Sequence, residues 1–348
     1  MKRFLLLYLL VALLLTGCGH TAPATSAGNS SLSSGPSVIV TTPFWSSSAT
    51  DPTLSVPCTV PTIPTAPTQP PEDYVIVSYA PQIQNGGVTY TGLPSLPVVD
   101  YLLRDPNNKE ELSTERIDFS FGVASDGKPH NRTVTNQQRF EDWGSGALAW
   151  DHVSQEKVLY LTFDCGYEYE NITSEVLDIL YEKGIQTTFF CTMTYLRSCP
   201  EMVARMIAEG HNVGNHSLSH PDDSAALSRE EMALQALAVE NYLRANFGYS
   251  AKYFRFPSGV YSENAVEVLS SVGYKSVFWS IAYADWDPKN QIGPEKAMQI
   301  LTERLHPGAV ILLHTTSCDN VAILANFIDY AISQGYTFRA LDDYPGWK

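Results

Sequence analysis

Reactive side chains follow an apolar run near the middle of the sequence, where Val158–Phe163 leads directly into Asp164, Cys165 and Gly166. If the run is a strand, these side chains stand at its carboxyl end, which is where α/β proteins carry their chemistry. Asp164 could act as a base. Cys165 could be a nucleophile, a metal ligand, half of a disulfide or a small buried residue, and the function depends on which of these it is.

Two histidines stand four residues apart in the segment 215–221, N-H-S-L-S-H-P. On one helical turn or in a tight loop, the imidazoles of His216 and His220 can reach the same divalent metal. Alone, such a pair is more often two surface histidines. The metal interpretation gains weight from the carboxylate, the thiol and a third imidazole, His314, which follow other predicted strands.

Two further residues fit the same kind of site. Arg255 opens the segment R-F-P-S-G at the end of a predicted strand, where it is better placed to pair with a carboxylate than to serve as a surface cation. Asp285, followed by Trp286, is by default a solvated or capping acid. Beside a catalytic histidine it could instead orient the imidazole.

The elements that must position these residues begin at Lys157, where strand-like and helix-like segments start to alternate. This alternation predicts a mostly parallel sheet, either a barrel or an open doubly wound sheet, with all the polar clusters at one face. Gly184, Gly210, Gly273 and Gly335 each follow a predicted helix, as C′ glycines do. Strands are expected at 158–163, 187–191, 211–214, 253–256, 276–280, 309–313 and 337–341, and helices at 172–183, 200–209, 229–247, 264–272, 294–305 and 321–334.

The segments T-F-D-x-G, H-S-x-x-H-P, R-x-P-x-G, D-W and L-L-H, in this order and spacing, resemble the NodB-homology polysaccharide deacetylases, carbohydrate esterase family four. The resemblance covers about 157–344. Residues 160–168, 277–286 and 306–320 resemble more narrowly the N-acetylmuramic acid deacetylases that prepare the muramic δ-lactam of the spore cortex, and 140–143 resembles the segment in front of that domain. The resemblance implies a distorted (β/α) barrel that hydrolyses an N-acetyl group on a β-1,4 glycan with the help of a metal.

The resemblance also implies a role for each residue that matches the family pattern. Position alone, and not the resemblance, suggests that Trp286 and Trp279 could stack on a sugar or belong to the core, and that Tyr167 and Glu168 could contact substrate. The implied roles are general base for Asp164, general acid for His314, support of the base for Arg255, tuning of the acid for Asp285, metal binding for His216 and His220, an oxyanion contact from the backbone N–H of Ser258, and a wall of the acetyl pocket for Leu312.

Two positions depart from the family pattern. Most members carry a second Asp, a metal ligand, where this chain has Cys165, and muramic acid deacetylases often carry an amide there. A thiolate would be a soft third ligand and would favour zinc, whereas a buried, inert Cys165 would leave the metal to two histidines and water. At Ser258, chitin-type relatives often have Tyr, and the smaller residue would leave room for the lactyl ether of muramic acid.

These observations favour a zinc-dependent deacetylase of N-acetylmuramic acid in peptidoglycan. One alternative is an N-acetylglucosamine deacetylase that acts on peptidoglycan or chitin-like oligomers. An alternative of another class is a non-catalytic glycan-binding module. That alternative is disfavoured because the base, the acid and both histidines are all present.

The N-terminus reads as an export signal rather than as part of the fold. Lys2 and Arg3 precede an apolar run, 4–15, and the motif L-T-G-C ends at Cys18 and resembles a lipobox, with ordinary secretion as the alternative. We expect four regions: a lipoprotein signal peptide at 1–17, a disordered Ser/Thr/Pro-rich tether at 18–72, a loop-rich extension packed on the barrel at 73–154, and the deacetylase domain at 155–348.

Charge and cysteine content limit the partners. The net charge of −15 provides no electrostatic footprint for nucleic acid or anionic lipid, so we expect peptidoglycan strands as the partner and the membrane to be contacted only through the lipid anchor. We expect an extracytoplasmic bacterial lipoprotein that acts as a monomer.

Five cysteines follow Cys18, so at least one thiol is unpaired within the chain, and the pairs 165–318 and 191–199 both remain open. The five are Cys58, Cys165, Cys191, Cys199 and Cys318.

Overall fold

The computed structural model describes residues 73–347. The expected signal peptide, the lipidated Cys18, the tether at 18–72 and Cys58 lie outside the described residues and stay predictions. Within 73–347, no helix combines the length and the apolar character needed to cross a membrane.

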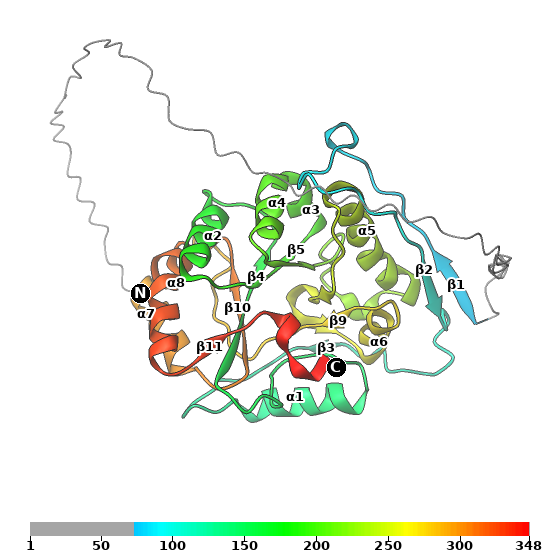
Figure 1. Cartoon of the computed structure of the whole chain (residues 1–348). Helices are drawn as coiled ribbons and strands as arrows, with labels where there is room; N and C mark the ends of the chain where they lie inside the picture. Colours follow the sequence, from blue (N-terminus) through cyan, green and yellow to red (C-terminus); the bar gives the residue numbers. More distant parts are fainter. Residues whose placement is uncertain (1–72, 348) are drawn as a thin grey trace, which may run out of the picture. The chain divides into compact units, whose positions relative to one another are not determined.

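A parallel sheet of seven strands forms the centre of the described chain (Figure 1). Its order is β10-β4-β5-β6-β7-β9, and β11 also pairs with β4. The sheet curls because residues 277–281, which follow β9, also hydrogen-bond to β10: Ser280 N–H donates to the carbonyl of Val310, and Leu312 N–H donates to that of Ile281. This confirms the distorted barrel. The strands are β4 (Val158–Cys165), β5 (Thr188–Cys191), β6 (Asn212–Asn215), β7 (Tyr253–Phe254), β9 (Lys275–Ser276), β10 (Ala309–His314) and β11 (Thr337–Phe338).

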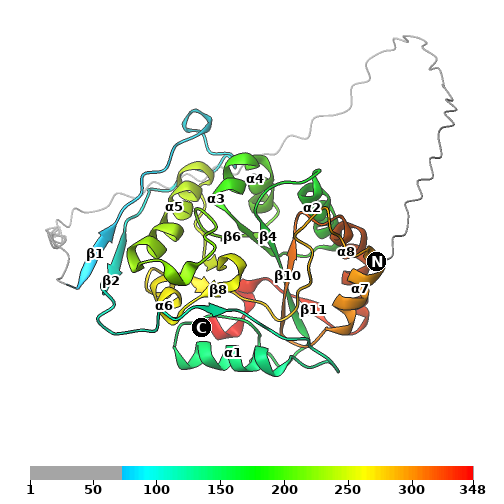
Figure 2. The same cartoon turned by 180° about the vertical axis from the view of Figure 1, so that it is seen from behind.

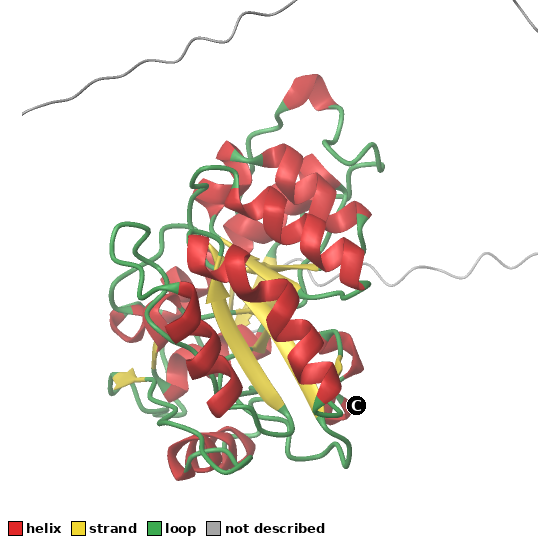
Figure 3. Cartoon of the chain, turned by 90° about the vertical axis from the view of Figure 1, so that its left-hand side faces the viewer, coloured by secondary structure: helices red, strands yellow, loops and turns green. Residues whose placement is uncertain are grey.

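Helices cover the outside of this sheet, as the side view makes plain (Figure 3). Alternate residues of β4 divide between two apolar cores: Leu161 and Phe163 pack against the helices, whereas Tyr160 faces the other core, inside the curled sheet. The helices are α2 (Ile172–Lys183), α3 (Met193–Ser198), α4 (Pro200–Ala208), α5 (Arg229–Phe247), α6 (Glu263–Ser271), α7 (Pro294–Glu303) and α8 (Cys318–Ser333).

Most helix boundaries agree with the sequence prediction, and α2 and α5 begin and end at the predicted residues. The four C′ glycines all have positive φ, 66° at Gly184, 82° at Gly210, 97° at Gly273 and 81° at Gly335, which confirms them as helix ends. The strand predicted at 276–280 is shorter and ends at Ser276. Beyond Ser276 the backbone hydrogen-bonds first to Leu148 and then to β10, so it does not continue alongside a single neighbouring strand.

The N-terminal extension adds three strands and a helix. The antiparallel pair β1 (Tyr74–Val77) and β2 (Tyr101–Arg104) lies beside α5 and α6 (Figure 2). Further along, β3 (Ile117–Asp118) forms a separate two-stranded sheet with β8 (Val260–Tyr261), which follows β7. Helix α1 (Asn131–Asp142) was missed in the sequence because its buried face carries polar side chains and so lacks apolar periodicity. That face consists of Thr133, Asn136, Gln137 and Phe140.

Candidate active site

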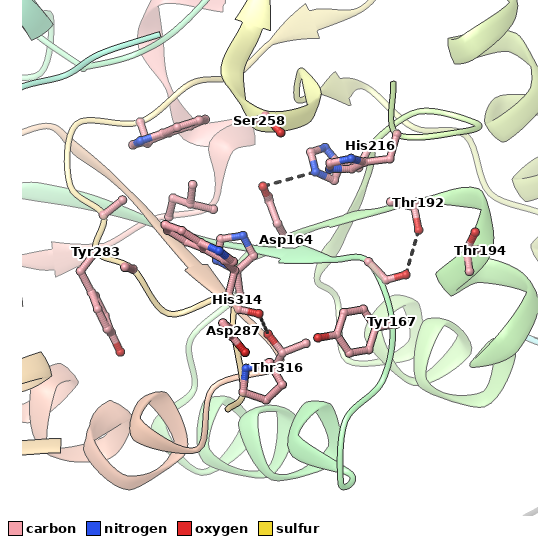
Figure 4. Close-up of a pocket in the computed structure, with 18 of the residues that line it drawn as sticks. Asp164, Tyr167, Thr192, Thr194, His216, Ser258, Tyr283, Asp287, His314 and Thr316 are labelled. Carbon is pink, nitrogen blue, oxygen red and sulfur yellow. Dashed lines mark hydrogen bonds and ion pairs between the residues drawn. The ribbon is translucent and has the colours of Figure 1, made fainter. Parts of the chain in front are cut away.

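A groove of about 1070 Å³ opens at the carboxyl ends of the strands. The predicted strand-end clusters meet there, as the barrel prediction requires. Figure 4 shows Asp164 pointing toward His216, with Ser258 and His314 on either side. Arg255 and Asp285 lie behind the lining and contact Asp164 and His314. The predicted site residues that line the groove are Asp164, Tyr167, His216, His220, Ser258, Trp279, Trp286, Leu312 and His314.

Asp164 is the central acid of the groove. The parallel pairing of β10 with β4 places it opposite His314 in register. Its Oδ1 accepts from Nη1 of Arg255 at 2.8 Å, and its Oδ2 lies 3.5 Å from Nε2 of His216. Burial raises the pKa of Asp164, but Arg255, His216 and His314 together lower it further, so the net pKa lies below the usual value. The carboxylate is therefore ionised at neutral pH and can accept a proton.

Arg255 is fully buried beneath the groove. Besides Asp164, its guanidinium donates to Thr162 Oγ1 at 2.9 Å and to the carbonyls of Val277 at 3.0 Å and Phe278 at 3.3 Å. Its Cζ also stacks over the ring of Phe190, at 4.2 Å from the centroid. The hydrogen bonds fix the guanidinium and hold one oxygen of the Asp164 carboxylate in place.

His216 and His220 lie in a tight loop rather than on a helical turn. Their ring centroids are 5.0 Å apart, and Ser217 and His220 have positive φ of 75° and 49°. Nδ1 of His216 donates to the carbonyl oxygen of Arg255 at 2.8 Å, since a carbonyl can only accept. Burial lowers the pKa of His216 to about 4, so the ring is neutral at neutral pH and its Nε2 carries a lone pair.

The side-chain atoms in this corner are of the kinds that bind a divalent metal, but fewer than three ligands converge in this arrangement. His216 Nε2 and Asp164 Oδ2 are both acceptors and face each other at 3.5 Å, an arrangement that a cation stabilises. Imidazole and carboxylate are ligands that zinc accepts, and the carbonyl bonded to Nδ1 is the usual support for a ligating histidine. No three His, Cys, Asp or Glu side chains of 73–347 converge closely enough to hold a metal. His220, whose ring lies 5.0 Å from that of His216, is exposed.

Cys165 does not join this group, and the idea of a soft third ligand is wrong for this arrangement. Successive side chains of a strand point to opposite faces, so Cys165 points with Phe163 into the core beneath the helices. It is fully buried, lies opposite Cys191 in register, and its Sγ accepts from the Thr315 hydroxyl at 3.4 Å. The preference for zinc therefore loses the support of a thiolate. Neither open disulfide pair forms: the thiols of Cys165, Cys191, Cys199 and Cys318 are free.

His314 and Asp285 form the second charged pair. Nδ1 of His314 donates to Asp285 Oδ1 at 2.7 Å, and the His314 backbone N–H donates to Oδ2 at 2.8 Å. Burial lowers the pKa of His314, but the carboxylates of Asp285 and Asp164 together raise it by more, and the net pKa lies above the usual value. The protonated ring keeps Nε2–H available as an acid. Asp164 and His314 thus have pKa values displaced in opposite directions in one groove.

Comparison with known proteins agrees with this geometry. A family model described as polysaccharide deacetylase matches residues 151–277. Peptidoglycan-N-acetylmuramic acid deacetylase PdaA of Bacillus subtilis (strain 168) is 38% identical over 190 residues, which is 55% of this chain and 72% of the relative. The chain belongs to the polysaccharide deacetylase family. A solved structure of Bacillus subtilis PdaA, a family 4 carbohydrate esterase, is 34% identical and covers 67% of this chain and 98% of the solved chain, with a TM-score of 0.63. A chitooligosaccharide deacetylase of Sinorhizobium fredii (strain NBRC 101917 / NGR234) is 34% identical over 157 residues, 45% of this chain and 71% of the relative.

In this polysaccharide deacetylase, Asn320 is a site residue that sequence reasoning missed. Its Nδ2 donates to Asp285 Oδ2 at 2.7 Å and to the His314 carbonyl at 3.0 Å, and its Oδ1 accepts from the Tyr283 hydroxyl at 2.5 Å. The side chain is fully buried at the start of α8. The signal available was the narrow resemblance of 306–320, which ends at this residue.

Replacing Asn320 with Leu is expected to lower the deacetylase rate by about tenfold, because the Asp285–His314 pair loses the amide that holds it. A looser pair lowers the pKa of His314, and since the acid must be protonated, the basic limb of the pH–rate profile moves to lower pH. The pH profile and an NMR titration of His314 measure this. Asn246→Leu, which removes a buried Asn of α5 whose side chain binds backbone groups, should lose stability without moving that limb. An unmoved limb in Asn320→Leu would refute the role.

The remaining predicted contacts divide between the groove and the scaffold of this deacetylase. Trp286 is 58% exposed, and its ring lies 6.2 Å from that of His314, so it is available to substrate. Ser258 lines the groove with a φ of 53°, a conformation that costs energy and is common at functional sites. Glu168 instead accepts from the Tyr195 hydroxyl at 3.0 Å and from Thr173 N–H, and it does not line the groove.

Proposed function

We propose that this chain is a peptidoglycan N-deacetylase that hydrolyses the acetamide of N-acetylmuramic acid with the help of a bound divalent metal, zinc being the first candidate. One observation carries the proposal: Asp164 and His314, adjacent in register across β4 and β10, have pKa values displaced in opposite directions and line one groove. The name of the PdaA relative supports the choice of substrate. The expected lipid anchor at Cys18 would hold the enzyme beside the cell wall, and recovery in the soluble fraction would contradict that part.

The chain's own residues supply the proton transfers of amide hydrolysis. Ionised Asp164 accepts a proton from the water that attacks the acetamide carbonyl. Protonated His314 then donates its proton to the sugar nitrogen as the C–N bond breaks, which releases acetate and a free amine. The backbone N–H of Ser258 is the proposed donor to the oxyanion.

The metal would be held by His216 and His220, with Asp164 beside them. When bound, it would lower the pKa of the attacking water toward about 7 and offset the negative charge that develops on the carbonyl oxygen. Arg255 keeps the base ionised and in position, and Asp285 keeps the acid protonated.

Small Ser258 favours muramic acid over glucosamine, because a hydroxymethyl side chain leaves space where a larger one would meet the lactyl ether. The alternative substrate is N-acetylglucosamine, and the chitooligosaccharide deacetylase relative keeps it open. A non-catalytic binding module would not need one charged pair that keeps a base ionised and a second that keeps an acid protonated.

Acetate release from matched peptidoglycan fragments tests the substrate and the metal together. We expect faster release from the muramic-type oligomer than from a glucosamine-type oligomer of the same length, and no release from the chelated enzyme. Reloading with zinc, cobalt, manganese or magnesium should restore activity. Equal rates on the two oligomers would contradict the choice of muramic acid, and full activity after chelation would contradict the metal.

A further inference from the structure

One residue that lines the groove comes from the N-terminal extension and not from the barrel. Phe121, three residues after β3, lines the groove and is half-buried there. It lies outside residues 151–277, the segment that the family model matches. A residue from this extension therefore reaches the substrate side of the site.

The backbone around Phe121 is fixed on both sides. Phe119 N–H donates to the carbonyl of Gly259 at 2.9 Å, which ties the segment to the loop that carries Ser258. From α1, Thr133 Oγ1 donates to the carbonyl of Phe121 at 2.8 Å, and Asn136 Nδ2 donates to that of Ser120 at 2.9 Å. A side chain held this way can bind a ligand without the cost of ordering a loop.

Phe121 continues an aromatic surface that extends toward the catalytic groups. Its ring centroid lies 6.3 Å from that of Trp279 at an angle of 62°, and Trp279 lies 5.0 Å from Phe119. The Trp279 ring in turn lies 5.6 Å from Cζ of Arg255, the partner of Asp164. Trp279 is only 8% exposed and belongs mainly to the core, so it backs the ring of Phe121, and Phe121 offers the more accessible face on this apolar side of the groove.

We propose that Phe121, backed by Trp279, forms a subsite for a sugar ring next to the sugar whose acetamide is hydrolysed; this rests on the proposed function. The C–H groups on one face of a pyranose pack on aromatic rings, which offer a large and rigid contact. A groove of about 1070 Å³ exceeds what a single sugar fills. Because the acetamide must lie at Asp164 and His314, the aromatic side is left for a neighbouring sugar of the strand.

Kinetics on substrates of increasing length test the subsite. Phe121→Ala should raise KM for a tetrasaccharide by roughly five- to tenfold with kcat unchanged, and leave the kinetics on a single N-acetylated sugar as in wild type. Phe121→Trp, which keeps an aromatic face, should restore a KM close to wild type. Tyr181→Ala, which removes an exposed aromatic of α2 outside the groove, is the matched control and should change neither constant.

Three results would overturn the subsite. The first is an unchanged KM in Phe121→Ala, and the second is an equal rise in KM on substrates of every length. The third is a rise in KM that accompanies a lower melting temperature and disappears when the variant is assayed well below that temperature. If wild-type enzyme releases no acetate from any glycan, the proposed function fails. Calorimetric titration with a chitin-type tetrasaccharide then decides the subsite separately: weaker binding to Phe121→Ala than to wild type supports it, and equal or absent binding overturns it.

Discussion

Replacing Asp164 with Asn is expected to slow acetate release by about 10²- to 10⁴-fold, the usual contribution of a positioned base. The amide is close in size to the carboxylate, and its oxygen can still accept from Nη1 of Arg255. It cannot take a proton from water. Because the Asp164 carboxylate also raises the pKa values of His314 and His216, the pH–rate profile has to be measured together with the rate.

The same change also affects stability, which has to be measured beside the rate. Asp164→Asn would leave the fully buried guanidinium of Arg255 without its counter-charge, although Thr162 and two carbonyls still accept from it. Removing one partner of a buried pair typically costs about 3 kcal/mol or more. We therefore expect a lower melting temperature but a folded protein at 25 °C, as measured by circular dichroism.

Asp151→Asn is the matched control, because Asp151 is another buried acid, bound to the Tyr160 hydroxyl and away from the groove. It should reduce stability and leave kcat near wild type. An unchanged rate of acetate release in Asp164→Asn would show that Asp164 is not the base.

The sequence predicts the site better than it predicts the extension, for a physical reason. The carboxyl ends of parallel strands meet at one face, so once the strand order is right, Asp164, His216 and His314 must converge. Cys165 follows Asp164 directly, and the apolar run alone did not indicate that the strand continues through it. Because β4 extends to Cys165, the alternation of the strand sends its thiol to the opposite face.

The residues that sequence reasoning missed depend on tertiary contacts. Asn320 gains its role from an acid 35 positions earlier in the chain, and an isolated Asn carries no signal of that partner. In α1, the polar side chains of Asn136 and Gln137 face the protein and bond to its backbone, so no apolar pattern marks the helix. Phe121 is an ordinary aromatic in sequence and reaches the groove through the pairing of β3 with β8 and the hydrogen bonds from α1.

Arg255→Met is expected to have the largest effect on stability, about 3–5 kcal/mol, because it leaves the Asp164 carboxylate buried without its cation. It also removes the donor from Thr162 Oγ1 and from the carbonyls of Val277 and Phe278. Deacetylation at neutral pH should fall steeply. Loss of the guanidinium raises the pKa of Asp164, and a protonated carboxyl cannot act as the base, so the acidic limb of the pH–rate profile moves to higher pH.

The pH dependence of stability separates this electrostatic effect from lost packing. In wild type the lowered pKa of Asp164 contributes stability that is present above its usual pKa of about 4 and is lost only as the pH falls through the lower folded value. In Arg255→Met the folded pKa is raised instead, so the folded state binds the extra proton and stability falls as the pH rises. Relative to wild type, the melting temperature of the variant should therefore rise as the pH is lowered from 8 to 5.

Arg229→Met, which removes a buried Arg paired with Glu267 away from the groove, should destabilise the protein without moving the acidic limb of the pH–rate profile. A difference in melting temperature that stays constant from pH 8 to pH 5, together with an unmoved limb in Arg255→Met, would mean that the guanidinium supports the fold and not the ionisation of the base.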